Sequence, residues 1–81
     1  MKVTESQIKD VLAKLFKIDP ATIDDDSSMD NIEAWDSLNH LKLVLALESA
    51  FDVSFTEEES VEILNFALIK EVLSEHGIEI E

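Results

Sequence analysis

Residues that interrupt helices are almost absent from this chain, which contains one proline, Pro20, and one glycine, Gly77. Because glycine and proline are the strongest breakers of regular structure, the stretches between them are free to form long helices. The 81 residues set a second limit, since a chain of this length buries only about 60% of the surface that its unfolded form exposes. We therefore expect a single domain over residues 1–81, with no room for a deep enclosed active site.

The charge of the chain is strongly one-sided. Nineteen acidic residues stand against six lysines and no arginine, which gives a net charge of −13. Such a charge repels nucleic acid and anionic lipid and favours partners with basic docking surfaces.

The absence of cysteine excludes disulfides, thiolate catalysis and cysteine metal sites. No apolar run approaches the ~18 residues of a membrane span, and the N-terminus does not resemble a signal peptide. We expect a cytoplasmic monomer without stable membrane insertion.

Helical spacing of apolar residues predicts a first helix over residues 3–16, in which Thr4 and Gln7 form a capping box. Its apolar face contains Ile8, Val11, Leu12, Leu15 and Phe16. Residues 18–36 lack sustained periodicity and predict a long loop, which in a small domain tends to be functional. Scattered apolar residues should pin this loop to the core: Ile18, Ile23, Met29, Ile32 and Trp35.

The acidic stretch within this loop, residues 24–28, is interpreted as solvated. An EF-hand count that starts at Asp24 fails, because Met29 replaces the turn glycine and Trp35 falls at the position of the bidentate glutamate.

A second helix is predicted over residues 37–50 with Asp36 as its N-cap. Its apolar residues are too many for one stripe. One face contains Leu43, Ala46, Leu47 and Ala50. Leu38, Leu41 and Leu45 lie on nearly the opposite face, where we expect a partly exposed patch of the kind that marks binding sites. The alternative is that the long loop covers this second stripe.

The C-terminal third predicts a short helical turn over residues 57–63 and a last helix over residues 66–76, capped by Asn65. Gly77 should end that helix, with Ile78 making the apolar contact of a Schellman-type terminus. The predicted core comprises Ile8, Leu12, Leu15, Phe16, Leu43, Leu47, Phe51, Ile63, Phe66, Ile69 and Leu73.

The segment Asp36-Ser37-Leu38 places a serine hydroxyl at the first turn of a helix. The unpaired N–H groups and partial positive charge of a helix N-terminus suit a serine that carries a phosphodiester. A helix cap alone is the simpler interpretation. His40 lies one turn after Ser37, but no Gly-x-Ser-x-Gly elbow surrounds the pair, so we expect a solvent-facing or partner-contacting histidine. His76 lies in the last turn of a predicted helix, where an interaction with the helix dipole is sufficient to explain it.

The chain resembles the acyl carrier protein family over nearly its whole length. The resemblance rests on Asp36-Ser37-Leu38 at mid-chain, the leucine-rich helix ending in residues 47–52, and the Glu-rich turn at residues 57–59. It implies an all-α fold, a small four-helix bundle with a short third helix and a long loop between the first two helices. It also implies a carrier without catalysis of its own. A phosphopantetheinyl transferase would attach 4'-phosphopantetheine from coenzyme A to Ser37, and the thiol of that arm would carry acyl or aminoacyl groups as thioesters.

Three positions depart from the pattern of fatty-acid carriers. Trp35 stands where many relatives have alanine. In having tryptophan at this position, the chain resembles carriers of specialised and peptide-synthetase-like pathways. Asn39 and Lys42 occupy positions that are commonly acidic in those relatives, whereas Glu48 matches them. The resemblance therefore favours a freestanding carrier of a specialised lipid or secondary-metabolite pathway over fatty acid synthesis.

The partners implied are the transferase and acyl-loading, condensing or transferase enzymes with basic docking surfaces. The residues expected to contact or steer them are Asp36, Leu38, Leu41, Lys42, Leu45, Glu48, Glu57, Glu58 and Glu59. The rival hypothesis is an acidic protein-binding module without a prosthetic group, acting as a nucleic-acid mimic or inhibitor, in which Ser37 has no special role.

Overall fold

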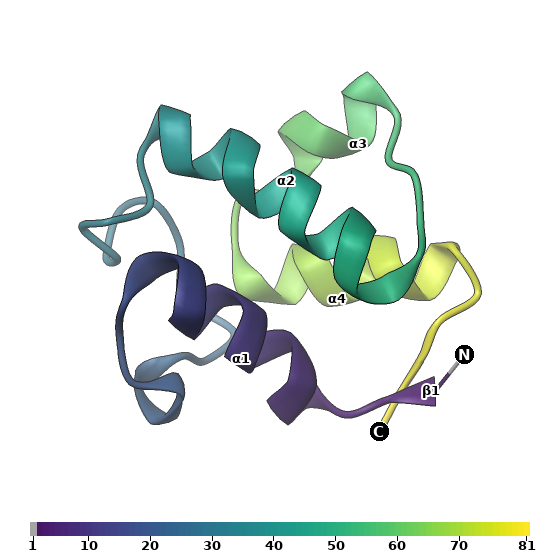
Figure 1. Cartoon of the computed structure of the whole chain (residues 1–81), viewed down its shortest axis with the longest axis horizontal. Coiled ribbons are helices and arrows are strands. Elements are labelled where there is room, and N and C mark those ends of the chain that lie inside the picture. Colours follow the sequence, from purple (N-terminus) through teal and green to yellow (C-terminus); the bar gives the residue numbers. More distant parts are fainter. Residues whose placement is uncertain (1) are drawn as a thin grey trace.

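The computed structural model describes residues 2–81. Four helices form the body of the molecule, and two short strands join its ends (Figure 1). In chain order the elements are β1 (Lys2–Val3), α1 (Glu5–Phe16), the 3-10 helix η1 (Pro20–Thr22), α2 (Ser37–Phe51), α3 (Glu57–Glu62), α4 (Phe66–Glu75) and β2 (Glu79–Ile80). The predicted all-α bundle with a short third helix and a long loop between α1 and α2 is confirmed.

The core lies where α1, α2 and α4 converge. Its fully buried aliphatic side chains come from all three helices and include Ile8, Leu12, Leu43, Leu47, Ile69 and Leu73. Ten of the predicted core residues are buried, whereas Leu15 is only partly buried at the edge of the cluster. Ala50, assigned to the inner face of α2 from its spacing, is exposed near the end of that helix.

The helix ends follow the chemistry of their capping residues. The Thr4 N–H donates to Gln7 Oε1 at 2.8 Å and the Gln7 N–H donates to Thr4 Oγ1 at 3.2 Å, which confirms the predicted capping box of α1. At the end of α4, Gly77 has φ +85° and the Ile78 N–H donates to the Leu73 carbonyl at 3.2 Å, as in a Schellman terminus.

The loop between α1 and α2 is attached to the body of the molecule along its length. The Phe66 N–H donates to the Ser27 carbonyl at 2.9 Å, and Ser28 forms an isolated bridge with Asn65. Of the apolar side chains expected to pin the loop, Ile23, Ile32 and Trp35 are buried and Ile18 is partly buried. Met29 is 37% exposed, so its predicted role in the core is wrong.

The interpretation of the acidic stretch as simply solvated is wrong in part. The Asp25 carboxylate forms an ion pair with Lys70 on α4, with 2.6 Å between Asp25 Oδ1 and Lys70 Nζ. Lys70 Nζ also lies 3.3 Å from Glu5 Oε1 on α1. The hydrogen bond to Asp25 raises the pKa of Lys70 above its ordinary value. Ser27 is buried. The loop is therefore tied to both α1 and α4.

A two-stranded parallel ladder joins the two ends of the described chain, which lie side by side in Figure 1. Lys2 pairs with Glu79 and Val3 with Ile80. Val3, which the predicted first segment includes ahead of the Thr4 cap, is a strand residue, and α1 begins directly after that cap at Glu5. Strands of two residues are too short to produce an alternating pattern, so the ladder leaves no signal in the sequence.

Candidate functional site

Ser37 is the first residue of α2 and its side chain is exposed. The preceding Asp36 is the N-cap, as predicted, and its carboxylate accepts from the Asn39 N–H at 2.9 Å. The Asn39 side-chain amide donates in turn to the Ala34 carbonyl at 2.7 Å. These two bonds hold the end of the loop against the first turn of α2, from which the Ser37 hydroxyl projects.

Behind Ser37 a chain of hydrogen bonds runs from the loop through α2 to α3. The Trp35 indole Nε1–H donates to His40 Nδ1 at 3.0 Å. Because Nδ1 accepts, the proton of the neutral imidazole lies on Nε2, which donates to the Ser60 carbonyl at 2.7 Å. Trp35 is 1% exposed and stacks on Phe16, with 5.4 Å between the ring centroids.

The expectation of a solvent-facing or partner-contacting His40 is therefore wrong. Both of its ring nitrogens are engaged within the fold, at Trp35 and at Ser60, so neither is available to take a proton from Ser37. The partners of His40 lie 5 and 20 residues away along the chain, so no local spacing pattern predicts the arrangement.

Three leucines of α2 face solvent next to Ser37. Leu38, Leu41 and Leu45 are 64%, 62% and 65% exposed. The predicted exposed stripe is confirmed, and the alternative that the loop covers it is wrong. Lys42 is exposed on the same helix. An exposed apolar stripe of this kind, beside an exposed hydroxyl, is typical of a surface that binds partners.

The acidic residues expected to steer partners differ in their surroundings. Glu57 and Glu58 are exposed in the first turn of α3. Glu48 instead uses one carboxylate oxygen, Oε2, to accept from the Phe55 N–H at 2.8 Å, which ties α2 to the segment before α3.

Glu59, also expected to steer partners, is used within the fold. Its side chain completes a capping box with Thr56, and its Oε2 atom lies 2.9 Å from His76 Nε2. The N–H of Thr56, assisted by His76, holds the pKa of Glu59 below its ordinary value. His76 also makes an edge contact with Phe55, so the helix dipole is not its only interaction.

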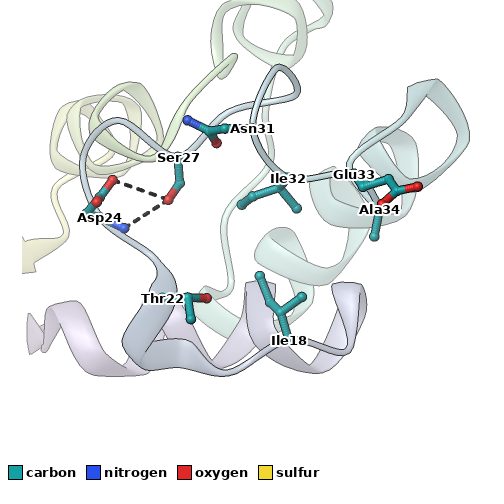
Figure 2. A pocket seen from close by; sticks show the side chains of 8 residues that line it. All are labelled: Ile18, Thr22, Asp24, Ser27, Asn31, Ile32, Glu33 and Ala34. Carbon is teal, nitrogen blue, oxygen red and sulfur yellow. Dashed lines mark hydrogen bonds between the residues drawn. The ribbon is translucent and has the colours of Figure 1, made fainter.

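A hollow of about 710 Å³ lies within the loop that precedes Ser37 (Figure 2). Ile18 and Ile32 form its apolar walls. The polar side chains at its other side are used by the loop itself, since Ser27 Oγ accepts from the Asp24 N–H at 2.9 Å and Asn31 Oδ1 accepts from the Ser28 N–H at 2.8 Å. These bonds shape the loop and leave the hollow without convergent polar groups of the kind that orient a ligand.

A family model described as the phosphopantetheine attachment site matches residues 6–67. The match covers more than half of the chain, from α1 through the loop, α2 and α3 into the start of α4. The chain belongs to this family. It is a phosphopantetheine-binding carrier protein with an attachment site for a covalent 4'-phosphopantetheine group, and the carrier domains of this family are not catalytic themselves. Members of the family are modified by phosphopantetheinyl transferases and interact with enzymes.

The start of α2 fits a phosphopantetheine group. The exposed hydroxyl of Ser37 would supply the oxygen of a phosphodiester, and the first N–H groups of a helix have no acceptor within the helix, which favours an anion there. The family match leaves the rival hypothesis, an acidic module without a prosthetic group, without support. Within residues 2–81, no helix combines the length and the apolar character needed to cross a bilayer.

Proposed function

We propose that Ser37 is the residue to which 4'-phosphopantetheine is attached, and that the chain delivers thioester-bound acyl or aminoacyl groups to partner enzymes. The observation that supports this most is the exposed Ser37 hydroxyl at the first turn of α2, beside the exposed leucine stripe and inside the segment matched by the family. Ser27 is buried, and Ser60 donates its hydroxyl to the Thr56 carbonyl at 3.0 Å, so neither presents a comparable group.

In this proposal the Ser37 oxygen attacks the β-phosphorus of coenzyme A. A phosphodiester bond forms at Ser37, the pyrophosphate P–O bond breaks, and adenosine 3',5'-bisphosphate leaves. The hydroxyl proton passes to a base of the transferase, because both ring nitrogens of the nearby His40 are already engaged. The rigid first turn of α2 presents the nucleophile and the transferase supplies the rest of the chemistry.

The test is intact mass after incubation with coenzyme A, Mg²⁺ and a phosphopantetheinyl transferase. One phosphopantetheine mass should be added to the wild type and none to Ser37→Ala. Ser49→Ala, which alters an exposed serine near the other end of α2, is the matched control and should be modified normally. Modification of Ser37→Ala, or an unmodified wild type, would overturn the proposal.

We further propose that the carrier serves a dedicated enzyme set in a specialised lipid or secondary-metabolite pathway. Lys42 is exposed on α2 beside the leucine stripe, where it would face the basic docking surface of a fatty-acid-synthesis enzyme. Like charges across an interface reduce the association rate and exclude partners. Glu57 and Glu58, exposed on α3, would steer the enzymes that do bind.

A further inference from the structure

A second exposed apolar surface lies between α3 and α4 and shares no residue with the leucine stripe of α2. Val61 and Leu64 are 64% and 51% exposed, although Ile63 between them is buried in the core. With Leu68 and Val72 of α4 they line a groove of about 330 Å³. Large apolar side chains gathered around a groove, and not scattered singly, mark a surface that binds something.

The rim of this groove is acidic. Glu62 of α3 and Glu71 and Glu75 of α4 complete its lining. Glu71 and Glu75 are four residues apart on one helix, a spacing at which like charges repel. The carboxylates of these three residues take part in none of the ion pairs formed among residues 2–81.

The lysine nearest in sequence does not relieve this repulsion. Lys70, directly before Glu71, is bound to Asp25 of the loop and Glu5 of α1. The groove therefore combines an apolar floor with carboxylates that have no cationic partner among residues 2–81. That charge pattern also repels an anionic bilayer and nucleic acid.

From this complementarity we infer that the groove between α3 and α4 docks an amphipathic helix of a partner protein, apolar on one face and basic along its borders. Apolar anchors of such a helix, spaced at i, i+3 and i+4, would enter the groove between Val61, Leu64, Leu68 and Val72. Its lysines or arginines would pair with Glu62, Glu71 and Glu75. A carrier held in this way keeps Ser37 and the leucine stripe of α2 free for other enzymes.

The experiment uses the full chain, both phosphopantetheine-bearing and as Ser37→Ala, so that it does not depend on the attachment proposal. The probe is a synthetic helical peptide with leucines on one face and lysines at its borders. Amide chemical shifts in the ¹⁵N spectrum locate the binding site, and titration gives the dissociation constant. Shift changes should centre on Val61, Leu64, Leu68 and Val72 in both forms.

Three double variants separate docking in the groove from attraction to the net charge. Glu71→Gln with Glu75→Gln should weaken binding about fivefold or more, whereas the matched control, Asp30→Asn with Glu33→Gln on the exposed loop, should change it less than about twofold. Val61→Ser with Leu64→Ser should weaken binding about tenfold, since it removes the apolar floor. The inference is overturned if the shifts map to Leu38, Leu41 and Leu45, if the groove pair and the control pair of carboxylates act equally, or if a sequence-scrambled peptide of the same composition binds as well.

Discussion

Trp35 lies buried in the core, two residues before Ser37. It fills the core beside Phe16 and also donates the hydrogen bond that fixes the tautomer of His40. Trp35→Phe keeps an aromatic ring but removes the donor, so His40 Nδ1 loses its partner in a partly buried site. We expect a loss of about 1–3 kcal/mol in the free energy of unfolding, measured by urea denaturation. In a double-mutant cycle with His40→Ala, the two changes should be coupled by about 0.5–3 kcal/mol. Strictly additive effects would contradict the hydrogen bond.

Lys42 gives a test of partner choice. If Lys42 faces the enzyme surface, Lys42→Glu should increase severalfold the rate at which a fatty-acid-synthesis enzyme loads the carrier. The increase should be largest at low salt, because charge attraction acts mainly on the association rate. The assay compares wild type, Lys42→Glu and the control Lys14→Glu, which makes the same charge change on α1. All proteins carry phosphopantetheine. Equal rates for wild type and Lys42→Glu at low salt would place Lys42 outside the interface.

At the scale of single residues, the sequence predicted what depends on near neighbours along the chain. Ser37 and its cap Asp36 were predictable because the first turn of a helix is a local feature. The bonds of His40 to Trp35 and Ser60, of Glu48 to Phe55 and of His76 to Glu59 depend on how the helices are placed. Such contacts across the fold leave no spacing pattern in the sequence.

Among the helices, α3 depends most on its ends, since it has only six residues and buries none of them fully. Its Glu59 has a pKa below the ordinary value, first because the Thr56 N–H donates to its carboxylate and then because of His76. The unfolded chain therefore binds a proton at Glu59 more readily than the folded chain does. This contribution to stability is present above the ordinary pKa of about 4.3 and is lost as the pH falls below it.

Glu59→Gln should therefore lower the melting temperature at pH near 7, and the difference from wild type should shrink as the pH falls through about 4. Melting curves followed by circular dichroism at several pH values measure this. Glu57→Gln, which changes an exposed carboxylate of the same turn, should have little effect. A difference that stays constant down to about pH 3 would mean that the carboxylate charge of Glu59 is not what stabilises α3.

Elements with long periodic patterns and clear caps, α1, α2 and α4, were predictable to within about two residues, as is usual for helix boundaries. The attachment of the loop was only partly predictable. The burial of Ile23, Ile32 and Trp35 was predictable because they are apolar residues in a polar segment. The pairing of Asp25 with Lys70 was not, because it joins residues far apart in the chain.

For the whole molecule, the net charge of −13 is confined to a body of 30 × 26 × 20 Å. At about 0.01 M salt the Debye length is roughly 30 Å, so every carboxylate repels the others across the protein, whereas at about 0.1 M it is roughly 10 Å. We expect the melting temperature to rise with NaCl over this range, and divalent cations to act at lower concentrations. Asp24→Asn with Asp26→Asn should reduce the increase in melting temperature with salt. A melting temperature that is flat or falls would mean that the structure already compensates its charges.

Because Trp35 is buried, its fluorescence can report on changes in the carrier without an added label. It is the only tryptophan in the chain, and it lies two residues from the proposed attachment serine, in a dry environment between Phe16 and His40. Indole emission moves to longer wavelength when the ring meets water and is quenched by a protonated imidazole in contact with it. Any change that exposes the Trp35 ring to water would therefore be visible as a change in fluorescence of the unlabelled protein in real time.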